Sequence, residues 1–149
     1  YIHPQWDHFG SETLYLKLLY VDYKKGAAII EFIGEWNDCL QNDIMFLKRE
    51  LIDLLIDEGI YKFVLIGENV LNFHSSDNSY YEEWNDDVVS EGGWIIALNF
   101  KDYVVQEMIA ADIQYYIYLS EKFKEIPWRK LKPAHLVQVL DDLLMKKIG

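Results

Sequence analysis

The chain has 149 residues, 51% of them hydrophobic and 15% aromatic, and a net charge of −11 from 25 acidic against 14 basic side chains. This length and hydrophobic content fit one folded domain and exclude a chain that is disordered over most of its length. The acidic balance argues against nucleic acid or an anionic membrane surface as a partner, because both are bound through clustered Lys and Arg. The basic cluster of the sequence consists of Lys122, Lys124, Arg129, Lys130 and Lys132.

A single cysteine, Cys39, excludes an internal disulfide and a zinc site built from cysteines. Its place at the expected start of a helix leaves two interpretations, a stabilised thiolate or a small packed residue. The sequence has no apolar run near the ~20 residues that span a bilayer and no signal-peptide pattern, so we expect a cytoplasmic protein. Because the chain starts at Tyr1 and not at Met, the sequence leaves open whether a native segment precedes Tyr1.

The first elements expected along the chain form a hairpin. Residues 1–11 lack a clear period and are expected to be an irregular lead-in. Residues 13–20 (TLYLKLLY) alternate β-forming residues with Lys, which is typical of an edge strand. After a turn at 23–26, residues 27–33 (AAIIEFI) form a nearly continuous apolar run, as in a strand covered on both faces.

The clearest element is a helix with Asp38 as its N-cap and Gly59 as its end. Its apolar residues recur every three to four positions, which places them on one face. They are Leu40, Ile44, Leu47, Leu51, Leu54 and Leu55. Residues 61–66 (YKFVLI) then predict a buried strand that ends at Gly67, and residues 68–78 predict an irregular loop rich in Asn, Ser and Asp.

The second half alternates helices and strands. Residues 79–82 (SYYE) have the form of a capping box, which predicts a helix from there to about residue 90. Residues 94–100 (WIIALNF) predict a buried strand, and Asp102 predicts the start of a helix. Residues 115–119 (YYIYL) predict the last strand.

Pro133 suits the first turn of a closing helix, whose apolar side carries Leu136, Val139, Leu140, Leu143 and Leu144. The order β-β-α-β-α-β-α-β-α predicts an α/β fold, with a mixed, mostly parallel sheet of about five strands and flanking helices. We expect a single domain over residues 1–149. The tetrapeptide Glu-Trp-Asn-Asp occurs at 35–38 and 83–86, but the flanking sequences do not match, so chance explains it better than duplication.

Three stretches carry a resemblance to a known family: residues 29–35 (IIEFIGE), 59–76 (GIYKFVLIGENVLNFHSS) and 92–113. With the element order over roughly residues 12–145, they resemble the STAS domain, the fold of bacterial anti-sigma-factor antagonists. The resemblance implies a regulatory interaction domain in which a partner kinase phosphorylates a serine and so controls partner binding. The matching serine here is Ser75, or Ser76 if the loop shifts by one.

The chain departs from the family pattern around these serines. His74 stands in place of an Asp, Asp77 replaces a Gly, and the helix that follows is bulky and acidic (YYEEWNDD). A phosphate at a helix N-terminus is locally favourable, but Asp77, Glu82 and Glu83 would repel it. The alternative is that both serines only bond nearby backbone amides.

Other groups have two interpretations each. Residues 74–77 (HSSD) contain the residue types of a catalytic triad, but contiguous residues rarely face one another and the chain has no nucleophile elbow. His3, Asp7 and His8 fit either a metal site or an exposed terminus.

Glu35, Asp38 and Asp43 follow the second expected strand, at the edge where open α/β sheets bind ligands. Three acids there suit a divalent cation, and they equally suit a solvated rim that favours the adjacent helix start. The glycines match neither phosphate-binding loop pattern, so we expect no nucleotide cofactor.

Eleven tyrosines and five tryptophans exceed what a core of this size requires. Tyr80, Tyr81 and Trp84 lie at an expected helix start, and Tyr and Trp are enriched in protein interfaces. They are therefore the candidate interaction surface. The alternative is that these rings cover the sheet.

The sequence thus predicts a non-enzymatic domain that binds a protein partner, such as a kinase or regulatory factor, with no cofactor, and it allows a homo-oligomer. Two alternatives stay open. A small-molecule or lipid-binding domain requires a deep apolar cavity. An enzyme that uses the carboxylates near Glu35 and Asp38 requires a concave pocket with convergent polar groups.

Overall fold

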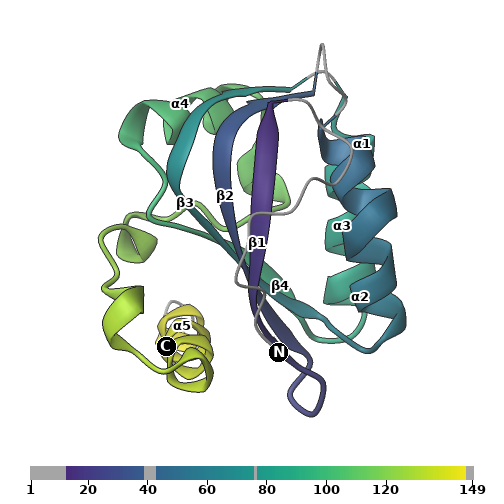
Figure 1. The fold of residues 1–149 in the computed structure, drawn as a ribbon, viewed down its shortest axis with the longest axis vertical. Coiled ribbons are helices and arrows are strands. Elements are labelled where there is room, and N and C mark those ends of the chain that lie inside the picture. Colours follow the sequence, from purple (N-terminus) through teal and green to yellow (C-terminus); the bar gives the residue numbers. More distant parts are fainter. Residues whose placement is uncertain (1–12, 39–42, 76, 147–149) are drawn as a thin grey trace.

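The computed structural model describes residues 13–38, 43–75 and 77–146. Within these residues a four-stranded sheet in the order β1-β2-β3-β4 forms the centre of the molecule (Figure 1). Its strands are β1 (Leu14–Asp22), β2 (Ala27–Asn37), β3 (Lys62–His74) and β4 (Trp94–Leu98). β1 is antiparallel to β2, whereas β2, β3 and β4 are parallel. The predicted mixed α/β fold, with its first hairpin antiparallel, is confirmed.

One face of the sheet is covered by helices from the middle of the chain. These are α1 (Asp43–Leu47), a π-helical turn (Lys48–Ile52), α2 (Asp53–Asp57), α3 (Ser79–Val89) and α4 (Asp102–Ala110). The larger core lies between them and the sheet, and it contains the fully buried side chains of Phe32, Leu47, Phe63 and Trp84. Phe63 and Trp84 meet edge to face with ring centroids 5.3 Å apart, a favourable aromatic geometry.

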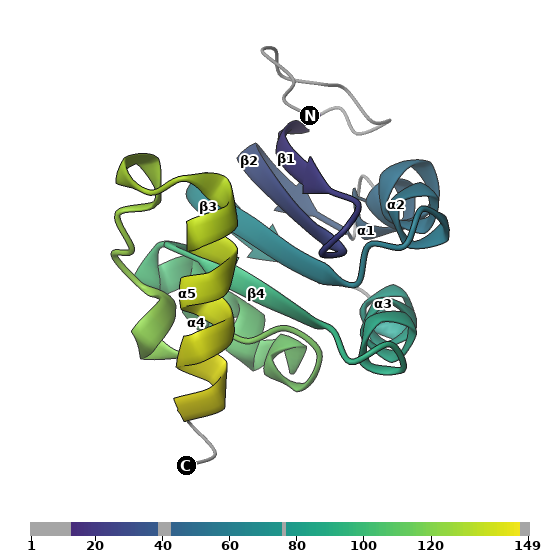
Figure 2. The same ribbon diagram turned by 90° about the horizontal axis from the view of Figure 1, so that it is seen from below.

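The opposite face carries α5 (Pro133–Lys146) and the segment that leads to it, as Figure 2 shows from below. This segment includes the short 3₁₀ turns Glu121–Phe123 and Trp128–Lys130. Ile29, Val64 and Ile96 of the sheet form a second, smaller core with Phe123, Leu136 and Leu140. The predicted closing helix is therefore confirmed. No helix among the described residues combines the length and apolarity needed to cross a bilayer.

The loop predicted at 68–78 is largely wrong, because β3 continues to His74. Beyond the end of β4, β3 pairs only with β2, and the register shifts twice along this stretch. The shifts keep Val70 and Phe73 in the core, while Asn69 and Leu71 remain exposed. A strand with bulges loses the regular alternation that sequence patterns detect.

The helix predicted from Asp38 has an irregular centre. Its described part begins at Asp43, and the turn Lys48–Ile52 is π-helical. Gly59 ends it as predicted, with φ at +95°.

The strand predicted at 115–119 is wrong. Asp112 takes the left-handed conformation after α4, and Ile113–Tyr115 form a 3₁₀ turn. Only Tyr118 reaches the edge of the sheet, as a single parallel bridge to Ile96. Ile117 between these points is buried in the larger core. The described sheet therefore has four strands where about five were expected.

Gly93, just before β4, lies directly against the backbone of Tyr61, just before β3. A Cβ atom at this position would lie 1.6 Å from the carbonyl oxygen of Tyr61, which accepts a hydrogen bond from the amide of Trp94 at 3.0 Å. We expect Gly93→Ala to lower the free energy of unfolding by about 2–4 kcal/mol, the sum of overpacking and a weakened hydrogen bond. Urea denaturation measures this change.

The matched control is Gly59→Asn. No atom lies within 4 Å of a Cβ at Gly59, and Asn tolerates positive φ, so we expect a loss below about 1 kcal/mol. Equal losses for the two variants would contradict the close approach at Gly93.

Candidate functional site

The loop with the candidate serines connects β3 to α3, at the carboxyl end of the parallel strands. Ser75 is half-buried, and its hydroxyl donates a hydrogen bond to Oδ1 of Asn78 at 2.9 Å. Nδ2 of Asn78 in turn donates to the carbonyl of Ala111, just after α4, at 2.8 Å. Ser75 is thereby connected through one side chain to the end of α4. Ser76, the second candidate, lies outside the described residues.

The start of α3 differs from the predicted capping box. Ser79 is the first helical residue, and the N-cap Asn78 makes no capping bond with its side chain. Instead Oδ1 of Asp77 accepts hydrogen bonds from the hydroxyl of Ser79 at 2.6 Å and from its amide at 2.8 Å. These two bonds lower the pKa of Asp77. An aspartate before the helix thus performs the role that the sequence pattern assigned to Ser79.

Beneath this loop lies a buried hydrogen-bonded junction of Trp36, Asp38 and Tyr81. The Tyr81 hydroxyl donates to Oδ2 of Asp38 at 2.5 Å. Nε1 of Trp36 lies 3.1 Å from Oδ1 of Asp38 and 2.8 Å from the Tyr81 hydroxyl. The amide of Ile44 donates to Oδ1 of Asp38 at 2.8 Å, so the carboxylate bonds to the first turn of α1. The amide of Asp38 donates to the carbonyl of His74 at 2.8 Å, at the end of β3.

Burial raises the pKa of Asp38 to about 6, against the opposing effect of the hydrogen bonds from Tyr81, Ile44 and Trp36. The neighbouring charge of Asp43 adds to the increase. Burial, and then the charge of Asp38, hold the pKa of Tyr81 well above its ordinary value. A perturbed carboxyl in a cleft is a common sign of catalysis. Here, however, both oxygens of Asp38 are bonded and only 1% of the residue is exposed, so it serves the structure.

The three carboxylates predicted to gather around a ligand point to different places. Glu35 is exposed and accepts a hydrogen bond from Nδ2 of Asn72 at 3.1 Å. Asp43 is buried, and its Oδ2 accepts from the amide of Asn37 at 2.7 Å. The described part of the chain contains no group of three or more His, Cys, Asp or Glu residues that could hold a metal ion. The predicted alternative of a divalent cation held by these acids gains no support.

The candidate interaction surface is wrong for two of its three members. Tyr81 and Trp84 are completely buried, because they face the sheet from α3. Tyr80 is half-buried, and the guanidinium carbon of Arg49 lies 5.1 Å from its ring centroid. A contact role for Tyr80 stays a prediction.

A network of charges that sequence reasoning missed joins the π-helical turn to α3. Lys48 is completely buried, and its Nζ forms ion pairs with Asp53, with Glu83 at 3.1 Å and with Asp87 at 3.1 Å. Arg49 adds bonds to Asp53 at 2.7 Å and to Glu83 at 3.0 Å. A signal existed: Lys48 follows Ile44 by four positions, which places it on the apolar stripe of the predicted helix.

The ion pairs determine the protonation states of this network. Burial alone would lower the pKa of Lys48, but the three carboxylates outweigh it and raise that pKa. The bond from Arg49 lowers the pKa of Glu83. Burial alone would raise the pKa of Asp53, but the bonds from Lys48 and Arg49 lower it. Lys48, Asp53 and Glu83 are therefore charged at neutral pH.

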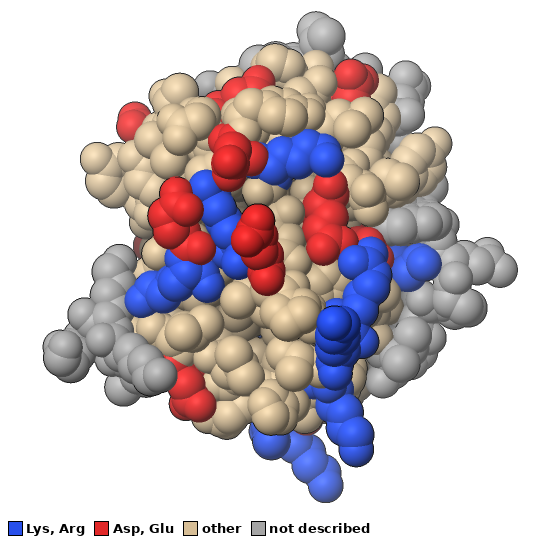
Figure 3. Space-filling view, turned by 90° about the vertical axis from the view of Figure 1, so that its left-hand side faces the viewer, with Lys and Arg blue, Asp and Glu red and all other residues tan. Residues whose placement is uncertain are grey.

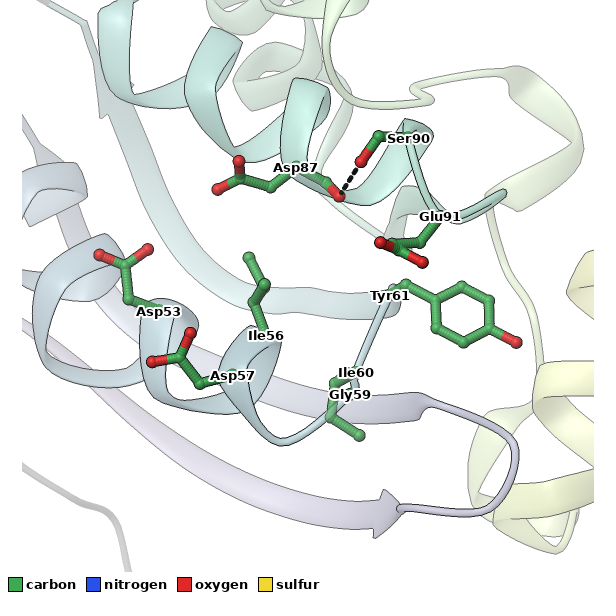
Figure 4. A pocket seen from close by; sticks show the side chains of 9 residues that line it. All are labelled: Asp53, Ile56, Asp57, Gly59, Ile60, Tyr61, Asp87, Ser90 and Glu91. Atoms are coloured by element: carbon green, nitrogen blue, oxygen red, sulfur yellow. Dashed lines mark hydrogen bonds between the residues drawn. The ribbon is translucent and has the colours of Figure 1, made fainter.

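Next to this network lies a cleft of about 720 Å³ between α2 and α3 (Figure 4). Four carboxylates line it: Asp53, Asp57, Asp87 and Glu91. The Ser90 hydroxyl at its rim donates to the backbone carbonyl of Asp87 at 2.9 Å. Two of these acids, Asp53 and Asp87, are already paired with Lys48.

The predicted basic cluster is divided among different partners. Lys124 pairs with Asp102 at 2.7 Å and with Glu121 at 3.0 Å. Arg129 pairs with Glu68 at 2.7 Å and lies 3.7 Å from the buried carboxylate of Glu31. Burial raises the pKa of Glu31, although the charge of Arg129 opposes this.

Several predictions concern residues that the structure does not describe. The thiolate at Cys39, the metal site at His3, Asp7 and His8, and the phosphorylation of Ser76 all lie outside the described residues. They stay predictions.

Comparisons with known proteins give a narrow result. No family model matches the chain, and no curated protein matches it. Among solved structures, it is similar to the phosphorylated form of the Bacillus cell fate determinant SpoIIAA, with 9% sequence identity and a TM-score of 0.47 over 72% of this chain and 93% of that chain. At this identity, no residue role is transferred by the likeness.

The raised pKa of Asp38 predicts a specific pH dependence of stability. Folding raises this pKa from about 3.9 to about 6, so the contribution of Asp38 is greatest below pH 4 and is lost as pH rises through 6. Asp38→Asn removes this titration. We therefore expect the stability of the wild type relative to the variant to fall by up to about 3 kcal/mol between pH 4 and pH 7.

Urea denaturation at both pH values measures this difference, and Asp77→Asn is the control. The pKa of Asp77 is lowered on folding, so its contribution is present above pH 4 and the difference changes in the opposite direction. A pH-independent difference for Asp38→Asn would contradict the buried titration.

The charge network predicts a second effect. We expect Lys48→Met to lower the free energy of unfolding at pH 7 by about 2–3 kcal/mol, because it removes a buried cation from three carboxylates. Since Lys48 lowers the pKa of Asp53 and Glu83, this loss shrinks as pH falls below about 4. Arg49→Met, at a half-exposed side chain, serves as the control and should cost clearly less than Lys48→Met, because solvent screens the ion pairs of Arg49. Equal costs would contradict the role of burial.

Proposed function

We propose that this chain is a non-enzymatic regulatory domain that acts by contact with a protein partner, and that phosphate on Ser75 or Ser76 changes this contact. The observation that carries the proposal is the hydrogen-bonded path from Ser75 through Asn78 to Ala111. It gives a modification of one loop residue a defined structural effect.

The path supports a switch because each bond depends on the one before it. A phosphate on Ser75 replaces the hydroxyl hydrogen, so the bond to Oδ1 of Asn78 is lost. A negative charge beside that amide oxygen also favours rotation of the Asn78 side chain, which would release Ala111 at the end of α4. The modification therefore alters both the loop and its attachment to α4.

The acidic residues around the loop support a mechanism in which they repel a phosphate on the serine. Asp77 and Glu82 are exposed on the loop and the first turn of α3, and a phosphate adds nearly two negative charges. The N-terminus of α3 partly compensates this charge. The expected outcome is a loop that changes its contact surface while the core stays folded.

The state of the carboxylates supports a role without catalysis. Asp38 and Asp43 bond to backbone and side-chain donors inside the protein, and Asp53 and Asp87 pair with Lys48. Bonds of this kind inside the protein disfavour a role for these acids as a general acid or base on a bound molecule.

The test compares binding by the wild type and five variants, each isolated from the protein's own cells. Mass spectrometry first locates phosphate on Ser75 or Ser76. We expect Ser75→Asp and Asn78→Ala each to change the set or amount of co-purified proteins at least about threefold, because both break the same path. Ser75→Ala should prevent modification at this position.

The control is Ser90→Ala, at an exposed serine on the far end of α3, which should leave the co-purified proteins unchanged. The switch would be excluded by two results together. Mass spectrometry would find Ser75 and Ser76 unmodified, and Ser75→Ala and Ser76→Ala would leave binding unchanged.

A further inference from the structure

A small pocket lies on the face of the sheet that α5 covers. Its volume is about 280 Å³, and it is formed by β1, β2, the 3₁₀ turn Trp128–Lys130 and the start of α5. The apolar side chains that line it are Leu19, Ile29, Trp128, Leu131, Pro133 and Leu136. The remaining lining residue is Arg129.

Both the buried floor of the pocket and its half-exposed walls are apolar. Ile29 and Leu136 belong to the smaller core and are 2% and 1% exposed, whereas Leu19, Trp128 and Leu131 pack against that core and remain half-exposed. Water in such a place finds few hydrogen-bond partners, so an apolar group gains by displacing it. A water-sized group occupies roughly 30 Å³, so the pocket has room for about nine or ten non-hydrogen atoms.

Three cations, Arg129, Lys130 and Lys132, belong to the segment of chain that lines the pocket. The Arg129 guanidinium lies 4.3 Å from the ring centroid of Trp128, and it is held there by Glu68 at 2.7 Å. Lys130 and Lys132 flank Leu131 in the sequence, are both exposed, and form no ion pair with any described residue. Among the described residues, no acidic side chain lines the pocket.

This arrangement contrasts with the rest of the molecule, whose net charge is −11. Figure 3 shows the side of the molecule along which the 120–132 segment runs, and Lys and Arg side chains form a band on one side of it. Clustered cations beside an apolar wall attract an anion and repel a cation. The positive charge next to the pocket therefore favours anionic molecules among those whose apolar part fits it.

We infer that this pocket binds a small anionic amphiphile, a carboxylate or phosphate monoester with a short apolar chain. The chain occupies the space between Ile29, Leu131 and Leu136, and the anion lies at the rim beside Lys130 and Lys132. Arg129, which already neutralises Glu68, positions the Trp128 ring as one wall. The site is separate from the β3–α3 loop and does not depend on the proposed function.

The test is a titration of ¹⁵N- and methyl-¹³C-labelled protein with three ten-carbon probes, decanoate, decanol and decyltrimethylammonium, each below the concentration at which it aggregates. We expect saturable shifts of the signals of Leu19, Ile29, Leu131 and Leu136. Decanoate should bind roughly tenfold more tightly than decanol, and decyltrimethylammonium more weakly than either.

Two variants separate the anion subsite from the apolar one. The double variant Lys130→Glu with Lys132→Glu should weaken decanoate roughly tenfold and leave decanol unchanged. Its matched control is Lys24→Glu with Lys25→Glu, which makes the same change of charge on the exposed turn between β1 and β2 and should change neither. Leu131→Glu should weaken decanoate and decanol together, because it places a carboxylate in the wall of the pocket.

Three results would overturn the inference. One is the absence of saturable shifts at these four residues with decanoate. Another is equal affinity for decanoate and decyltrimethylammonium, which would show that the rim does not select charge. The third is an equal loss of decanoate binding in the two double variants, which would assign the effect to net charge and not to the pocket.

Discussion

The placement of the helices next to the β3–α3 loop depends on one buried carboxylate. Asp38 is 1% exposed, and a charge in that position is tolerated only if its oxygens are hydrogen-bonded. Its partners come from three elements: Trp36 from β2, Tyr81 from α3 and the amide of Ile44 from α1. Each element must keep its position for the carboxylate to be satisfied. The carboxylate therefore sets the geometry on which the β3–α3 loop rests.

Lys48 plays a comparable role farther along the same helices. Its ammonium group is buried between the π-helical turn and α3, and three carboxylates satisfy it. A buried charge specifies one arrangement, because apolar contacts alone allow neighbouring helices to slide by small amounts. With Asp38 at the start of α1 and Lys48 after its end, the helices next to the loop are held at two points. The loop can change without a change in the helices beneath it.

Capping patterns in the sequence predicted the starts of α3, α4 and α5, and hydrophobic patterning predicted the first hairpin and β4. It failed where the chain leaves a regular repeat. In β3, polar residues such as Asn69 and Asn72 alternate irregularly with Val70 and Phe73, because the register shifts there, and the pattern was interpreted as a loop. The aromatic run at 115–119 has strong β-propensity, but the left-handed Asp112 turns the chain so that only Tyr118 reaches the sheet.

The candidate site shows the same limit. Asp38 was predicted as a helix cap, and it does accept an amide of α1, but its burial follows from long-range contacts that no local pattern contains. Tyr81 and Trp84 were candidates for an interaction surface, with coverage of the sheet as the alternative, and the structure supports the alternative. Aromatic composition alone does not distinguish an interface from a core. The serine position was found from a family resemblance, whereas its connection to Ala111 through Asn78 required coordinates.

The single bridge made by Tyr118 also determines how the sheet meets other chains. Its amide donates to Ile95 and its carbonyl accepts from Ala97, while the amide of Asn99 donates to Phe123. These bonds occupy outward-facing backbone groups along β4, which would otherwise template the addition of a foreign strand. The uncharged segment 115–119 has the composition of an amyloid-forming stretch. In the folded protein the same segment closes the edge at which fibril growth would begin.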